Sequence, residues 1–407
     1  MAAGNYTQSE FYEMVDGMSH QKFSQVNDRQ VTSNRAVRYV LGDIDIRSTK
    51  RKSALSPNLF KDVYDYSAPS DLKENKIIDI RKQVRRSNIE GWMMVDESDF
   101  DRTKEISSYR IAVSDDELVR ILKIDGVEGS VSANLHNCDS LTANGTWAAS
   151  ADASNLTIDT ENFITSSGAL NFDTAKGAAT AVVTLTDATQ VDLTDHDEKS
   201  SLFVWVFIPD ATDAQGESVT NFILRWGNDS SNYWHRTVTT NNEGAAFYDG
   251  WNLLRFDWNG ATEVGTVAPS TIDYIVLTIT KDTALEADTD WRVDDIVSRV
   301  GEIYDVIYYS KFGWQNSSNA YIEESTATTD TLNADTTEIE LFAFKAAEMA
   351  AQELKELKDV EYFRGEYERL KGQYTASVPS EALRIKRNYY EAPQIGRGGG
   401  WKRMSSN

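Results

Sequence analysis

The chain is poor in the residues from which disulfides and most catalytic centres are built. Cys138 is its only cysteine, so an intrachain disulfide is excluded and stability must come from burial or assembly. No Ser-His-Asp or Cys-His arrangement is suggested, and the signatures GxxxxGKS/T, GxGxxG and HExxH are absent. The sequence therefore predicts a protein that is not an enzyme and has no catalytic cofactor. Its four histidines are scattered, at His20, His136, His196 and His235.

Long apolar runs are also absent. No stretch reaches about 18 apolar residues, the length that a membrane-spanning helix needs. The N-terminal sequence MAAGNYTQSEFYEMVDG lacks the basic start and apolar centre of a secretion signal. We therefore expect a chain that folds in a reducing cytoplasm and has no membrane partner.

Two short segments have the composition of a site but not its context. GRGGG (396–400) does not lie between a strand and a helix, so a phosphate-binding loop is not expected there. The run DHDE (195–198) places neighbouring residues on one turn, where they rarely converge on a metal ion. A solvated acidic loop is predicted instead.

Negative charge is concentrated in one block. Residues 128–300 hold 8 Lys and Arg against 26 Asp and Glu, whereas 1–127 hold 20 against 21 and 301–407 hold 13 against 17. The same block contains seven of the ten tryptophans. Because such blocks are usually domains, the sequence predicts an inserted domain over 128–300.

The composition of this block predicts an antiparallel β-sandwich. Its apolar segments are short, rich in β-branched and aromatic residues, and separated by Asn, Asp, Gly and Ser. In SLFVWVFIP both faces are apolar, which indicates a central strand, and GNDSSN (227–232) is predicted to be a hairpin loop. The predicted strands are AVVTLTD (181–187), SLFVWVFIP (201–209), NFILRWG (221–227), NYWHRTVTT (232–240), WNLLRFDW (251–258), TIDYIVLTIT (271–280) and DWRVDDIVSR (290–299).

The flanking regions have a mixed pattern. Helices are predicted after the capping-box sequence at Thr7 to Glu10 and over 34–41, followed by several strand-like runs up to residue 124. The strand-like segment 301–314 is expected to pair with 117–124 at the base of the sandwich. From Glu338 to Tyr374, apolar residues recur every three or four positions and predict one helix of about 50 Å, long enough to need a neighbouring subunit as cover.

The last segment, 381–407, combines glycines with basic and aromatic residues. One interpretation is a disordered tail; the other is an arm that becomes ordered on an acidic or nucleic-acid partner. The second interpretation makes the following residues candidates for contact with a partner or an adjacent subunit: Arg384, Lys386, Arg387, Tyr389, Tyr390, Arg397, Trp401, Lys402 and Arg403.

The segments GALNFDT (168–174), NYWHRTV (232–238), FYDGWNLLRFDW (247–258) and DWRVDDIVSR (290–299) resemble the jelly roll of carbohydrate-binding modules. That resemblance implies a structural calcium ion bound by Asp294 or Asp295 together with a loop residue such as Asp139. It also makes Trp226 and Trp234 candidates for stacking on a sugar, although tryptophan at alternating strand positions is more often part of a core.

The flanks, with TSNRAVRYVLGDIDIRSTKRKSALSPNLFKDVYDYSAPSDL (32–72), FAFKAAEMAAQEL (342–354) and the basic arm, resemble the head–tail connector (adaptor) proteins of tailed bacteriophages. The resemblance implies a virion protein of the neck, made in the bacterial cytoplasm. It would form a ring, usually of twelve copies, between the portal and the tail or neck proteins. Non-specific contact with passing DNA is a further expectation.

Together these patterns predict an α+β multidomain fold, in which a helical adaptor core with a small β-sheet is interrupted by the sandwich. The predicted segments are 1–127 (first part of the core), 128–300 (sandwich), 301–380 (strand and long helix) and 381–407 (arm). The predicted function is a connector with a peripheral jelly roll. The alternative is a tail or capsid decoration protein that binds surface glycans through the sandwich.

Overall fold

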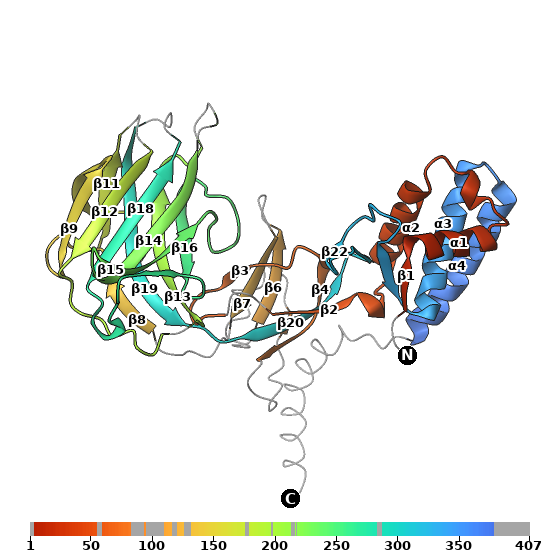
Figure 1. Cartoon of the computed structure of the whole chain (residues 1–407), viewed down its shortest axis with the longest axis horizontal. Helices are drawn as coiled ribbons and strands as arrows, with labels where there is room; N and C mark the ends of the chain where they lie inside the picture. The colour runs from red at the N-terminus through yellow and green to blue at the C-terminus, as the bar shows by residue number, and fades with distance from the viewer. Residues whose placement is uncertain are drawn as a thin grey trace, which may run out of the picture.

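The computed structural model describes residues 4–54, 59–82, 93–94, 110–115, 120–125, 132–175, 179–196, 198–212, 216, 218–282 and 287–377. Figure 1 shows an elongated molecule with a β-sandwich at one end, small sheets in the middle and helices at the other end. Strands hold 44% of the described residues and helices 24%. The predicted α+β fold with a helical adaptor core is therefore wrong, and the chain is mostly β. The apolar runs of the first flank pair as strands, which confines the helices to one end of the molecule.

The β-sandwich predicted for the middle of the chain is present. Sheet I has the order β10-β11-β19-β13-β16, with β8 beside β19, and sheet II has the order β17-β15-β14-β18-β12-β9. Among the described residues, the strand pairings within these sheets are antiparallel. The strands of sheet I are β8 (Ser132–His136), β10 (Ala153–Asp159), β11 (Ala169–Thr174), β13 (Ser200–Ile208), β16 (Gly250–Asp257) and β19 (Asp288–Val300). Those of sheet II are β9 (Thr146–Ala151), β12 (Thr180–Thr186), β14 (Val219–Asp229), β15 (Asn232–Val238), β17 (Thr262–Val264) and β18 (Tyr274–Lys281).

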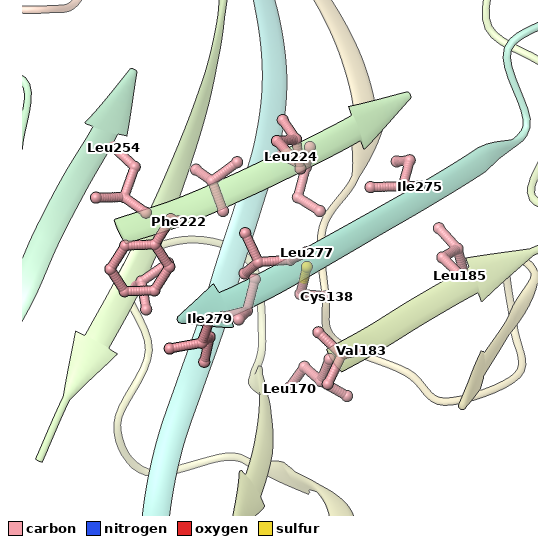
Figure 2. Close-up of a cluster of buried hydrophobic side chains, with 14 of the residues drawn as sticks. Cys138, Leu170, Val183, Leu185, Phe222, Leu224, Leu254, Ile275, Leu277 and Ile279 are labelled. Carbon is pink, nitrogen blue, oxygen red and sulfur yellow. The ribbon is translucent and has the colours of Figure 1, made fainter. Parts of the chain in front are cut away.

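The core of the sandwich lies between the two sheets. Figure 2 shows side chains that meet there from separate strands, among them Leu170, Val183, Phe222, Leu254 and Leu277. Cys138 is fully buried in the same cluster. This burial of large apolar side chains from every central strand stabilises the sandwich by the hydrophobic effect.

Strand β13 is central in sheet I, as its sequence predicts. Its alternation sends Leu202, Val204, Val206 and Ile208 into the core between the sheets. The intervening residues Phe203, Trp205 and Phe207 therefore point to the opposite, outer face of sheet I. Phe203 is buried there, whereas Trp205 and Phe207 are half-buried.

The predicted hairpin at 227–232 is confirmed. β14 and β15 pair in antiparallel register with Trp226 opposite Trp234. The Asp229 carboxylate accepts hydrogen bonds from the backbone N–H groups of Ser231 and Asn232, at 2.7 and 3.0 Å, which fixes the turn.

Two small sheets form the middle of the molecule. One has the order β2-β20-β4 and the other β3-β7-β6-β5. The predicted pairing of 301–314 with 117–124 is wrong, because β20 lies between β2 and β4 while β7 pairs with β3 and β6. The strands are β2 (Lys50–Ala54), β3 (Asp65–Ser67), β4 (Leu72–Lys82), β5 (Met93–Met94), β6 (Arg110–Asp115), β7 (Arg120–Asp125) and β20 (Tyr304–Ser310).

The middle sheets pack against one end of the outer face of sheet I and cover it. Arg255 of β16 is 7% exposed, and its guanidinium lies 4.6 Å from the ring centre of Phe60 and 5.8 Å from that of Phe203. Its Nε donates to Asp257 at 2.8 Å. The rings of Phe60 and Phe203 pack edge to face at 5.0 Å. This buried contact covers the β13 and β16 residues nearest the middle sheets and leaves the other end of the face open.

The helices gather around a four-stranded sheet at the far end of the molecule (Figure 1). The helix predicted over 34–41 is longer than expected, and the capping box of the first helix, between Thr7 and Glu10, is confirmed. The elements are α1 (Gln8–Met18), α2 (Arg29–Asp43), α3 (Thr336–Glu353), α4 (Leu357–Ser377), β1 (Gly4–Thr7), β21 (Trp314–Gln315), β22 (Tyr321–Ile322) and β23 (Thr331–Ala334), with short 3-10 turns at Phe23–Gln25, Arg47–Thr49 and, in the sandwich, Pro269–Thr271.

The single long helix predicted over 338–374 is wrong. The chain breaks between α3 and α4 at Lys355, whose φ of 61° is left-handed and incompatible with a continuous helix. α3 and α4 then pack against each other and bury apolar residues of both in one cluster. The apolar stripe is thus covered within the chain, and the argument for a covering subunit no longer holds. Within the described ranges, no helix has the length and apolar character needed to cross a membrane.

Candidate functional site: the open face of sheet I

Five residues form a straight row across the outer face of sheet I. Trp251 of β16 lies opposite Phe207 of β13, Phe207 opposite Arg292 of β19, Arg292 opposite Asn171 of β11, and Asn171 opposite Thr157 of β10. Residues in register on antiparallel strands point to the same face. With strands about 4.8 Å apart, the row extends roughly 19 Å across the sheet.

The row is aromatic at one end and polar at the other. Phe207 and Trp251 are half-buried, and their rings meet edge to face with centres 5.6 Å apart. Trp205, also half-buried, lies two residues away on β13 and points to the same face. At the other end Thr157 donates to the Asn171 side chain at 3.3 Å. The face therefore offers apolar ring surface and hydrogen-bonding groups side by side.

Arg292 holds the centre of the row in a fixed position. Its guanidinium lies 4.7 Å from the centre of the Phe207 ring. Nε donates to the Asp159 carboxylate at 2.6 Å, and Nη1 donates to the Asp290 carbonyl at 3.1 Å. The side chain is only 9% exposed. Arg292 thus covers one face of the Phe207 ring in a cation–π contact.

Asp159 ties the 160–168 loop to this arrangement. Its carboxylate accepts hydrogen bonds from the N–H groups of Glu161 and Asn162, at 2.8 and 3.1 Å, besides the one from Arg292. Burial alone would raise the pKa of Asp159, but these hydrogen bonds outweigh it and lower the pKa to about 2. Asp159 is therefore a stable carboxylate at neutral pH.

A pocket of about 550 Å³ lies along the row. The 160–168 loop contributes one lining residue, β16 contributes Trp251, and the end of β13 and the start of β19 contribute the rest. Its lining residues are Asn162, Phe207, Pro209, Trp251, Ala287, Asp288, Thr289, Asp290 and Arg292. Concave sites with aromatic walls and a few placed polar groups are typical of small-molecule and sugar binding.

The two tryptophans predicted to stack on a sugar lie elsewhere. Trp226 has no exposed surface and belongs to the core between the sheets, whereas a stacking platform needs an open ring face. Trp234 is half-buried and packs against that core, with its ring centre 5.3 Å from that of Trp258. The site residues that the sequence interpretation missed are Trp205, Phe207, Trp251 and Arg292.

The three aspartates predicted to bind calcium, Asp139, Asp294 and Asp295, lie near Cys138. Burial is the main cause that raises the pKa of the Cys138 thiol, and the negative charges of these aspartates raise it further. Asp294 is fully buried, and its carboxylate accepts from the N–H groups of Ile164 and Thr165 at 2.7 and 2.8 Å. Asp295, at φ 51°, lies where the register between β13 and β19 shifts. Asp139 accepts from the Ser167 hydroxyl at 3.3 Å.

This arrangement does not fit a calcium site. The Asp294 carboxylate is occupied by loop N–H groups, which are donors and not cation ligands. Among the residues that the structure describes, no group of three His, Cys, Asp or Glu side chains converges so as to hold a metal ion. The carboxylate instead anchors the 160–168 loop to β19. The predicted contact residues of the arm, Arg384 to Arg403, lie outside the described residues.

No protein-family model matches this chain, and no curated protein matches its sequence. The family 30 carbohydrate-binding module of a cellulosomal cellulase of Clostridium thermocellum is 11% identical with a TM-score of 0.31, over 42% of this chain and 97% of that one. The CBM22-1 xylan-binding domain of Paenibacillus barcinonensis Xyn10C is 17% identical with a TM-score of 0.23, over 43% and 97%. An exo-beta-agarase is 12% identical with a TM-score of 0.28, over 41% and 25%.

Each of these solved structures covers less than half of this chain. At such identities and TM-scores they carry no argument about a ligand. Nothing in the comparisons supports the predicted identity as a head–tail connector.

Proposed function

We propose that this protein binds a glycan on the outer face of sheet I and does not cleave it. The observation that carries the proposal is the half-exposed pair Phe207 and Trp251 in register with the polar residues Asn171 and Thr157, along a pocket of about 550 Å³. Sugars present apolar C–H faces and hydroxyl edges, and this row offers a matching partner for each.

The roles within the row follow from its chemistry. The Trp251 ring would stack on the C–H face of one sugar unit, with the Phe207 ring packed edge to face against it. The side chains of Asn171 and Thr157 would exchange hydrogen bonds with hydroxyl groups of the next. Arg292 would keep the Phe207 ring in place and contribute no direct contact, since its Nε already bonds to Asp159.

Asp159 is not suited to act as the acid of a glycosidase. Glycoside hydrolysis uses a carboxylic acid whose pKa is raised so that it can donate a proton near neutral pH. The pKa of Asp159 is lowered, to about 2, and its carboxylate is committed to the loop and to Arg292. The open face of sheet I favours the binding role over the ring-forming role, for which the predicted unbroken long helix was one of the arguments.

The substitution Trp251→Ala should abolish most of the affinity. An aromatic anchor at the centre of an interface typically contributes about 2 kcal/mol, which corresponds to a roughly thirtyfold rise in Kd. A glycan array would identify the ligand, and isothermal titration calorimetry would compare the variant with the unaltered protein. Because Trp251 is half-buried on an outer face, the variant should remain folded.

The matched control is Tyr233→Ala, which removes a half-buried aromatic side chain from a strand of sheet II. It should leave the affinity unchanged. The open face of sheet I is not the binding site if the Trp251→Ala variant binds the glycan as tightly as the unaltered protein, or if both variants lose the same amount of affinity.

A further inference from the structure

The groove formed by the lining residues of this pocket contains one cation, and that cation is engaged by the protein itself. Arg292 donates to Asp159 at 2.6 Å and to the Asp290 carbonyl at 3.1 Å, and only 9% of its side chain is exposed. A carboxylate or sulfate on a ligand would have to displace these bonds to reach it. Such an exchange would break the ion pair between Arg292 and Asp159, whose side chains are only 9% and 15% exposed, which is costly.

Of the two acidic residues that line the groove, Asp288 is half-buried and Asp290 is exposed. Asp290 follows Asp288 by two residues at the start of β19, and both line the pocket. The Asp290 side chain is 63% exposed. Its Oδ1 accepts a hydrogen bond from the Asn171 side-chain amide at 3.4 Å and lies 3.8 Å from the nearest Arg292 nitrogen. More than half of the side chain still faces solvent at the edge of the groove.

The surrounding domain reinforces this local charge. Residues 128–300 hold 8 Lys and Arg against 26 Asp and Glu. Summed fields of this kind attract ligands of the opposite sign and repel ligands of the same sign, and a concave site with walls of low dielectric strengthens the effect.

We propose that the groove selects its glycan by charge, so that a glycan bearing protonated amino groups binds best and a glycan bearing carboxylates binds worst. The inference rests on the proposed function, since the aromatic rings of Phe207 and Trp251 supply the basal affinity. Asp290 is the residue that sets the preference, because it carries an exposed carboxylate at the edge of the groove.

The test uses three hexasaccharides of equal length: glucosamine, N-acetylglucosamine and glucuronic acid. Titration of the full chain at pH 6 should give the lowest Kd for the glucosamine chain. The N-acetylglucosamine chain should bind on the order of fivefold more weakly, and the glucuronic acid chain more weakly still. Added salt should narrow these differences because it screens exposed charges.

The variant Asp290→Asn should reduce the preference for the amino sugar without removing the affinity for the neutral chain. Asp290 has a φ of 73°, and asparagine tolerates that left-handed conformation well, so the exchange introduces no strain. Asp187→Asn is the matched control, because Asp187 is also exposed at positive φ, 54°, but follows β12 in the other sheet. It should leave the order of affinities unchanged.

The outcomes separate the two hypotheses. Affinities that are equal for the three chains, or an order in which the glucuronic acid chain is best, overturn the charge preference while the proposed function stands. If none of the three chains binds but another glycan binds in a way that depends on Trp251, the charge preference is again overturned and the proposed function stands. Absence of Trp251-dependent binding to any glycan overturns the proposed function and the preference together.

Discussion

Replacement of Glu338 by alanine should lower the free energy of unfolding of the helical end by about 3–5 kcal/mol. Glu338 has no exposed surface, yet its carboxylate accepts three hydrogen bonds from separate parts of the chain. The donors are the Asp335 N–H at 2.9 Å, the Ser48 N–H at 3.2 Å and the Tyr374 hydroxyl at 2.7 Å. The alanine variant leaves the buried Tyr374 hydroxyl and the two half-buried N–H groups without this acceptor.

The position of Glu338 explains why the loss should be large. The carboxylate closes the capping box of α3 and also links it to the end of α4 and to the turn after α2. Burial, together with the bond to Glu338, raises the pKa of Tyr374, so its hydroxyl remains a donor at neutral pH. One side chain thus joins three elements whose apolar residues share one core.

Chemical denaturation followed by circular dichroism would measure this effect. Glu340→Ala is the matched control, since Glu340 is an exposed residue of the same helix and its removal should change stability by no more than about 0.5 kcal/mol. A Glu338→Ala variant as stable as the Glu340→Ala variant would contradict the linking role.

The strands of the sandwich could be predicted from sequence because their signal is local. β-branched and aromatic runs ended by Asn, Asp and Gly gave seven strands whose positions agree with the structure to within a few residues. The break at Lys355 could not be predicted in this way. No glycine or proline marks it, and the apolar spacing continues through it, so only the packing of α3 on α4 reveals that the chain turns.

The candidate site was harder to predict for a different reason. Alternation shows that Phe203, Trp205 and Phe207 share a face, but not whether that face is the core or the surface. That depends on strand pairing, which is not local. Trp226 and Trp251 have similar sequence surroundings, yet the first lies in the core and the second lines the pocket. Arg292 becomes recognisable as a site residue only when Asp159 is seen beside it.

Some predictions are not tested by the described residues. They are the ring of twelve copies, the portal and tail partners, the contact with passing DNA, the location in a virion neck and the role of the 381–407 arm.

The flanks also bear on the glycan-binding proposal. The middle sheets cover one end of the outer face of sheet I, where Arg255 packs against Phe60.

The substitution Trp291→Ala should destabilise the sandwich by about 3–5 kcal/mol, the cost of removing a buried tryptophan from a core. Trp291 has no exposed surface, stacks on Phe172 at 6.3 Å and packs near Phe222 at 6.5 Å. Its Nε1–H has no hydrogen-bond partner in the structure. Trp291→Phe should therefore cost much less than Trp291→Ala, because it keeps an aromatic ring and removes an unpaired buried donor.

Differential scanning calorimetry of the full chain would distinguish this effect from that at Glu338. The core that contains Trp291 shares no residue with the helical core, so Trp291→Ala should lower the melting temperature of the sandwich and leave that of the helices largely unchanged. Trp291→Ala should also weaken glycan binding at temperatures where the sandwich begins to unfold, since Arg292 and Asp290 adjoin it on β19. A single transition shifted equally by Trp291→Ala and Glu338→Ala would instead show that the two ends unfold as one cooperative unit, joined through the contact of Arg255 with Phe60.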